Sequence, residues 1–104
     1  MERIRQGDVL RVSGIKAPIL VVSNESFNQM REVIACPLLS DIDKNAIHPQ
    51  VLIRSNQQEI SALVACEDPR HLDLKSRNYT RLGSIDYFQM MDVADILIGM
   101  IEYI

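Results

Sequence analysis

The sequence predicts a small α+β domain in which short antiparallel strands coil into a barrel and a C-terminal helix covers one side. Apolar runs of strand length, separated by turn residues, occupy the first two thirds of the 104 residues. The tail then changes to apolar spacings of three and four, which are typical of a helix. No repeat or linker interrupts the chain, so we expect residues 1–104 to form one domain.

The expected strands differ in how they are buried. Gly7 to Ser13 alternates, which places Val9 and Arg11 on one face of a half-buried strand. The run PILVVS is continuously apolar and suits a strand covered on both faces. The strand that ends in ACP is expected to stop at Pro37. The five segments are 7–13, 18–23, 32–37, 50–54 and 60–66, with a connecting turn at 24–29 and a hairpin-like link before residue 60.

The C-terminal helix is expected to start near Ser84 and to be amphipathic. Ser84 follows a glycine and can accept a hydrogen bond from an early helix N–H, and Asp86 suits the positive end of the helix dipole. Gly99 destabilises a helix by about 1 kcal/mol relative to alanine, which close packing against another backbone would offset. The expected apolar stripe is Met90, Val93, Leu97, Met100 or Ile101, and Ile104.

Composition excludes several classes of protein. The net charge of −3 disfavours a protein that wraps nucleic acid by bulk charge. No apolar run is long enough to span a bilayer and no leader is visible, so we expect a cytoplasmic protein without a membrane partner. Cys36 and Cys66 lie in apolar segments and are expected to be buried thiols. His48 and His71 are not grouped with other ligands, so no metal and no cofactor are expected.

Two segments together resemble the toxin family that includes MazF, PemK, Kid and, more distantly, CcdB. PILVVSNESFNQMREVIACPLLSD is similar to that family's second and third strands, with a proline, an aliphatic run, a turn holding Phe-Asn and a strand ending in a Cys-Pro step. CEDPRHLDLKSRNYTRL resembles the PemK/Kid signature of Cys, acidic or amide residues, Pro-Arg, Asp, Arg-Asn and Arg-Leu. RQGDVLRV fits the first strand, so the resemblance spans nearly the whole chain.

The resemblance implies an SH3-like antiparallel barrel with a C-terminal helix, a homodimer, and a cognate antitoxin as partner. Most members inhibit growth as metal-independent endoribonucleases that cut single-stranded RNA through its own 2′-hydroxyl. CcdB-like members instead bind DNA gyrase and catalyse nothing. The resemblance therefore favours a toxin of a type II toxin–antitoxin system that cleaves RNA, with a non-catalytic protein-binding toxin or an inactive homologue as the alternative.

Cleavage through the 2′-hydroxyl needs a base, an acid and groups that hold the phosphate. Glu67 is the expected base and His71 the expected acid, since imidazole titrates near neutrality. Ser40 could supply the hydroxyl that the family carries as threonine. The expected substrate-binding cations are Lys16, Arg70, Arg77 and Arg81.

The resemblance also implies three replaced residues. The family's arginine before the second-strand proline is here Ala17, its threonine is Leu39, and its arginine beside the cysteine is Ala65. The competing interpretation is that Glu67 and Arg70 form a surface ion pair, while the histidine is structural and the remaining arginines are solvated. The choice depends on whether Pro37 ends the strand early enough for Ser40, rather than Leu39, to face the groove.

Overall fold

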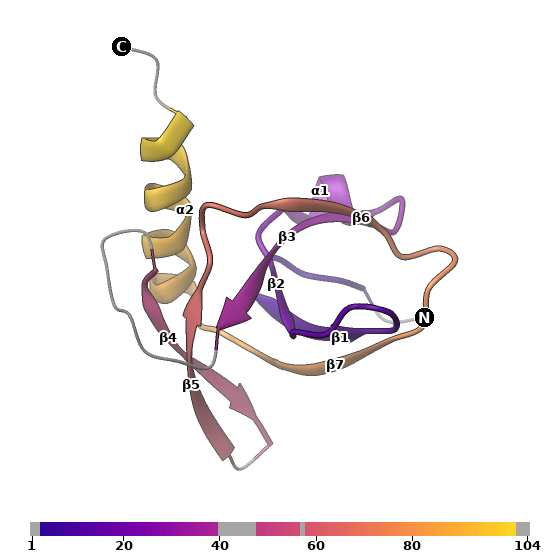
Figure 1. Cartoon of the computed structure of the whole chain (residues 1–104), viewed down its shortest axis with the longest axis horizontal. Helices are drawn as coiled ribbons and strands as arrows, with labels where there is room; N and C mark the ends of the chain where they lie inside the picture. Colours follow the sequence, from indigo (N-terminus) through magenta and orange to yellow (C-terminus); the bar gives the residue numbers. More distant parts are fainter. Residues whose placement is uncertain (1–2, 40–47, 57, 102–104) are drawn as a thin grey trace.

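The computed structural model describes residues 3–39, 48–56 and 58–101. Within these ranges the chain forms strands and two helices around a small barrel, with α2 along one side (Figure 1). The elements are β1 (Asp8–Val12), β2 (Ile19–Val21), α1 (Glu25–Asn28), β3 (Glu32–Leu39), β4 (Gln50–Ser55), β5 (Gln58–Val64), β6 (Arg70–Asp73), β7 (Tyr79–Ser84) and α2 (Tyr87–Ile101).

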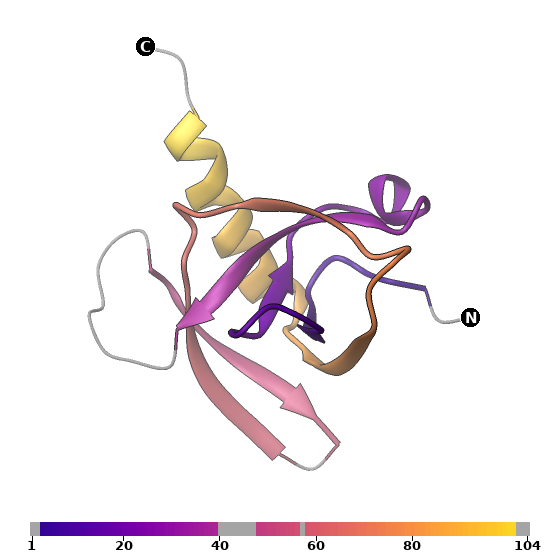
Figure 2. The same ribbon diagram turned by 45° about the vertical axis from the view of Figure 1, so that its right-hand side comes forward.

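Six antiparallel strands close into a ring, which confirms the predicted barrel. Their order is β2-β1-β7-β4-β5-β3, and β3 pairs back with β2. The strand β6 adds to the first half of β3, where Ala35 opposes Arg70. The far end of the β4–β5 hairpin projects beyond the ring in both ribbon views (Figures 1 and 2).

The middle strands are covered on both faces, as the run PILVVS predicts. Leu20 and Cys36 pack into a core cluster with Met90 and Val93 of α2. Ile19 and Val21 point the other way, into a second core cluster that includes Leu10 and Val33. All three residues of β2 are fully buried, because successive side chains of one strand enter different cores.

The predicted end of β3 at Pro37 is wrong. The strand continues through Leu38 and Leu39, which oppose Val64 and Leu63. The ladder continues because the Pro37 carbonyl accepts a hydrogen bond from the amide of Ala65 at 2.9 Å. A proline lacks a donor but keeps its acceptor, so it stays in the strand where only the acceptor is needed.

The N-terminal cap of α2 is Asp86, two residues later than the expected cap at Ser84. The side chain of Asp86 accepts a hydrogen bond from the amide of Gln89 at 2.9 Å and caps the helix. Ser84, the expected cap, is instead the last residue of β7 and opposes Arg54. The segment expected as a turn at 24–29 contains the short helix α1, whose cap is Asn24.

The apolar stripe of α2 is only partly buried. Met90 and Val93 are in the core and Leu97 packs against it, but Met100 and Ile101 are exposed; Ile104 lies outside the described residues. An added Cβ on Gly99 would meet no atom of another element within 4 Å in the described part of the chain, so the close packing expected there is not found among these residues. No helix in the described ranges is long and apolar enough to cross a membrane.

Candidate functional site

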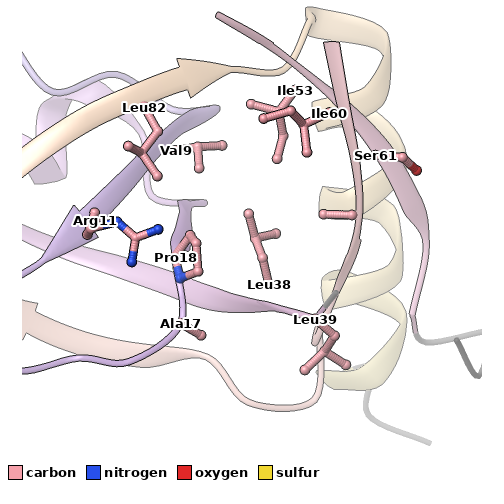
Figure 3. A pocket seen from close by; sticks show the side chains of 11 residues that line it. Val9, Arg11, Ala17, Pro18, Leu38, Leu39, Ile53, Ile60, Ser61 and Leu82 are labelled. Atoms are coloured by element: carbon pink, nitrogen blue, oxygen red, sulfur yellow. The ribbon is translucent and has the colours of Figure 1, made fainter. Parts of the chain in front are cut away.

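A pocket of about 400 Å³ lies between the closed ring and the projecting hairpin, and we call it the apolar pocket (Figure 3). Its walls come from β1, the residues before β2, the end of β3, the β4–β5 hairpin and β7. Most of its lining is aliphatic. The lining includes Arg11, Ala17, Pro18, Leu38, Leu39 and Ser61.

Leu39 lines the apolar pocket together with Ala17, because β3 runs on past Pro37. The alternative was that the strand would end early and turn Ser40 toward Glu67 and Arg70. Ser40 lies outside the described residues. The resemblance assigns an arginine to the position of Ala17 and a threonine to the position of Leu39. Both positions line the apolar pocket, and both have apolar side chains.

Arg11 is the charged side chain of the apolar pocket. Figure 3 shows its guanidinium directed inward, beside Val9 and Pro18, whereas the hydroxyl of Ser61 is directed away. Arg11 forms no ion pair with any residue of the described ranges. It was absent from the predicted site, although its alternation with Val9 on one strand face was a usable signal.

The predicted base, Glu67, lies in the β5–β6 turn and does not line the apolar pocket. Both of its carboxylate oxygens are 2.9 Å from Nε2 of His48. This hydrogen bond is the largest of the effects that lower the pKa of Glu67 below its ordinary value. His48 was missed because it stands 19 positions away in the sequence and only the fold brings the pair together.

The competing interpretation, a surface ion pair between Glu67 and Arg70, is wrong about the partners. Arg70 instead pairs with Asp68, at 2.7 Å between Nη2 and Oδ2. Hydrogen bonds from Arg70 lower the pKa of Asp68. Both side chains of this pair are nearly half exposed, so solvent screens it.

His71, the predicted acid, belongs to an exposed network on β6 and β3. Its Nε2 lies 2.7 Å from Oε1 of Glu32, whose other oxygen is 3.0 Å from Nζ of Lys75. Hydrogen bonds from Lys75 and then His71 lower the pKa of Glu32. The ring of Phe27 meets the imidazole edge-on. The network explains His71 without reference to the apolar pocket.

The predicted cations do not converge on the apolar pocket. Lys16 is exposed, and it is the neighbouring Ala17 that lines the pocket. Arg77 donates to the carbonyl of Ser13 at 3.4 Å. Arg81 pairs with Asp8 on the other face of the β1–β7 ladder. The third replaced position, Ala65, is buried.

Both cysteines are buried free thiols, as predicted. Burial raises the pKa of Cys36 to about 12 and that of Cys66 to about 11, so neither is an activated nucleophile. The described residues contain no group of three or more His, Cys, Asp or Glu side chains placed to hold a metal ion.

Comparison with known proteins decides the family. Residues 11–101 match the model of the "PemK-like, MazF-like toxin of type II toxin-antitoxin system". The chain belongs to this toxin family. No curated protein matches the sequence significantly.

Solved structures agree with this fold. The MazF toxin in a MazE–MazF complex from Deinococcus radiodurans superposes with a TM-score of 0.79 at 20% identity, over 96% of this chain and 97% of that chain. A mycobacterial endoribonuclease in complex with its cognate antitoxin gives 0.75 at 18% identity, over 97% and 99%. At these identities the match establishes the MazF-like barrel of this toxin and leaves its chemistry to its own residues.

Proposed function

We propose that this toxin inhibits growth by binding a protein target through the apolar pocket rather than by cleaving RNA. The observation that carries the proposal is that Ala17 and Leu39 both line that pocket. RNA cleavage needs a base, an acid and cations where the phosphate lies; Arg11 supplies one cation, but Ala17 and Leu39 supply neither the arginine nor the hydroxyl that the family carries at these positions. On this proposal the chain shares the barrel fold with the catalytic members of the family. It lacks their arginine and threonine, since these positions are Ala17 and Leu39.

The pocket suits an apolar side chain next to an acidic one. Apolar walls stabilise a buried aliphatic or aromatic group at about 25 cal/mol per Å² removed from water. Arg11 at the same wall can pair with a nearby carboxylate, which fixes the orientation of the bound segment. We propose that the cognate antitoxin covers this pocket and thereby competes with the target, and that both encounters take place in the cytoplasm.

The test combines growth inhibition with an RNA assay on the same preparations. We expect the wild-type chain to arrest growth while leaving varied single-stranded RNA intact, with or without a chelator. Leu39→Asp places a carboxylate in the pocket and should abolish growth arrest. Met30→Asp is the matched control, since Met30 is 68% exposed on the turn after α1.

RNA cleavage is the second candidate, and the His48–Glu67 pair favours it. An imidazole and a carboxylate held at 2.9 Å could supply the base that takes the proton of the 2′-hydroxyl and the acid that protonates the leaving 5′-oxygen. Against this role, the lowered pKa of Glu67 makes the carboxylate a weaker base. RNA cleavage that is lost in Glu67→Gln, and absent for RNA with a 2′-deoxy substitution at the cut site, would replace the first proposal by this one.

We propose a second copy of the chain as the partner of the exposed face of α2. Tyr87, Phe88, Ile98 and Ile101 are each more than 60% exposed, at 72%, 76%, 66% and 78%. A solvent-facing apolar stripe of this size is characteristic of an interface. Light scattering at micromolar concentration should give a dimer, and Phe88→Glu with Ile98→Glu should give a monomer. A monomeric wild-type chain would contradict the proposal.

A further inference from the structure

A second cavity, of about 310 Å³, is lined by charged side chains alone, and we call it the arginine cavity. Arg3 and Arg5 come from the segment before β1, Asp8 opens β1, and Arg81 lies in β7. Asp8 and Val9 are neighbours in β1, so their side chains point to opposite faces; Val9 lines the apolar pocket, whereas Arg81 pairs with Asp8. The two cavities therefore lie on opposite sides of one ladder.

A closed turn fixes the position of Arg5. The amide of Asp8 donates to the carbonyl of Arg5 at 3.0 Å, and the amide of Arg5 donates to Oδ2 of Asp8 at 2.8 Å. Gly7 takes a φ of 95°, a left-handed value that favours glycine. Its amide donates to Val21 and its carbonyl accepts from Ile85, so the turn is bonded to both of its neighbours.

The buried carboxylate of Asp8 fixes Arg81. Only 4% of the Asp8 side chain is exposed, and its Oδ1 accepts from Nε of Arg81 at 3.0 Å. Both carboxylate oxygens are therefore occupied, one by the backbone of the turn and one by this guanidinium. The terminal nitrogens of Arg81 have no partner among the described residues and remain available as donors.

Among the described residues, positive charge exceeds negative charge around this cavity. The guanidinium of Arg5 forms no ion pair within the described ranges, and Arg3 pairs at 3.3 Å with Glu25 in an exposed contact. Three guanidinium groups thus face two carboxylates, one of which is buried and already engaged. Like charges held around one cavity repel one another unless an anion enters.

We propose that the arginine cavity binds a phosphate group. Guanidinium forks donate pairs of parallel hydrogen bonds to phosphate oxygens, and three forks suit the several oxygens of a phosphate better than the two of a carboxylate. The cavity is larger than a phosphate alone, which leaves room for an attached sugar. The phosphate can come from a free nucleotide or from a nucleic-acid backbone, and the inference holds whether or not the toxin cleaves RNA.

Inorganic phosphate titrated into the full chain is the first test, with amide and arginine Nε–H signals followed by NMR at constant ionic strength. We expect saturable shifts in residues 3–8 and around Arg81. A nucleoside monophosphate and a short single-stranded oligodeoxynucleotide, titrated separately, distinguish the two sources by which binds more tightly. Uniform shifts at all arginines, or equal shifts with acetate, would overturn the proposal; the acetate result would indicate an acidic peptide instead.

Arg5→Gln is the decisive variant because the Arg5 side chain has no partner in the described part of the fold. It should weaken phosphate binding by about tenfold or more, the effect of one charge-assisted hydrogen bond. Arg54→Gln is the matched control, an exposed arginine on the hairpin that pairs with Glu59, and should leave phosphate binding unchanged. Equal weakening by both variants would show a diffuse charge effect and would overturn the site.

Discussion

The apolar pocket and the arginine cavity share strands β1 and β7 but differ in every other respect. One face of the ladder carries Val9 and Leu82, and the other carries Asp8 and Arg81. Asp8 and Val9 are neighbours in β1, so their side chains point to opposite faces, and the apolar face carries one charged group, Arg11. One small barrel therefore carries two cavities of different chemistry, and the ligands that we propose for them should respond to different conditions.

The two cavities are also stabilised differently. The apolar pocket adjoins a core cluster that includes Val9, Leu38 and Ile53, so its shape depends on packing. The arginine cavity depends on a buried carboxylate and a hydrogen-bonded turn. Binding at the first should tolerate salt, whereas binding at the second should weaken as salt screens its charges.

The largest expected loss of stability comes from a substitution that disrupts the fold, and both cavities with it. Gly83 lies on β7 where it crosses β4, and an added Cβ would stand 2.5 Å from the carbonyl oxygen of Arg54. Gly83→Ala should destabilise the fold by about 3 kcal/mol, because the two backbones must separate. Denaturant unfolding monitored by circular dichroism measures this loss.

Gly99→Ala is the matched control for that substitution. An added Cβ there meets no described residue outside its own helix within 4 Å, and alanine is favoured over glycine in a helix. We therefore expect stabilisation of up to about 1 kcal/mol. Equal effects of the two substitutions would mean that the backbones of β7 and β4 do not approach each other closely at Gly83.

The next effect distinguishes the two cavities. Asp8→Asn turns one carboxylate oxygen into an amide donor, which must face either the backbone N–H of Arg5 or Nε–H of Arg81. We expect a loss of about 2 kcal/mol, typical of a buried donor without an acceptor. Asp92→Asn, at an exposed position of α2, should change stability little.

The same variant separates the two binding functions. At a temperature where it is folded, Asp8→Asn should lose phosphate binding and keep growth arrest, since Asp8 does not line the apolar pocket. Loss of both functions at equal folded fraction would mean that the two faces are coupled.

Much of the fold was predictable from the sequence, because hydrophobic periodicity reports burial directly. The run PILVVS predicted a strand with two buried faces, and β2 has them. The strands β6 and β7 were not predicted, since their exposed residues produce no apolar run: three of the four in β6 face solvent. The end of β3 was misjudged because a proline usually ends a strand, and here only its carbonyl is needed in the ladder.

The candidate site was less predictable than the fold. Glu67 was chosen from a motif, but its partner His48 is distant in sequence, and no local signal joins them. Arg11 was visible on the face of Val9 yet belonged to no motif. Arg81 was chosen as a substrate cation, but its role depends on a buried carboxylate 73 positions away. Side-chain convergence of this kind follows from topology rather than from local pattern.

The stability of the core cluster beside the apolar pocket should depend on pH above about 9, because this cluster contains two cysteines. Cys36 and Cys66 belong to the core cluster beside the apolar pocket, and burial raises their pKa values from 9.0 to about 12 and about 11. A thiol with a raised folded pKa contributes stability that is complete below pH 9 and is lost as the pH rises toward the folded pKa. Each thiol should add a slope of up to about 1.4 kcal/mol per pH unit.

Unfolding free energies at pH 8 to 10.5 test this slope, with Cys36→Ala as the comparison. The variant should be less stable at pH 8 because it leaves a small cavity. It should also lose stability less steeply with rising pH than the wild type. Parallel slopes would show that Cys36 does not govern the alkaline side.

The smallest effect tests whether burial, rather than charge, distinguishes the arginine cavity from other ionic clusters. Glu32 also meets two basic groups, Lys75 and His71, but its side chain is 31% exposed where that of Asp8 is 4% exposed. The pKa of Glu32 is lowered from 4.5, so its contribution to stability is present above that pH and is lost as the pH falls through the folded value.

Glu32→Gln should therefore change stability at pH 7 far less than Asp8→Asn. It should flatten the dependence of stability on pH only on the acid side, below pH 4.5. Unfolding of both variants at pH 7 and pH 3.5 gives the comparison. Equal losses at pH 7 would mean that the buried carboxylate has no special role, and that the arginine cavity is an ordinary solvated cluster.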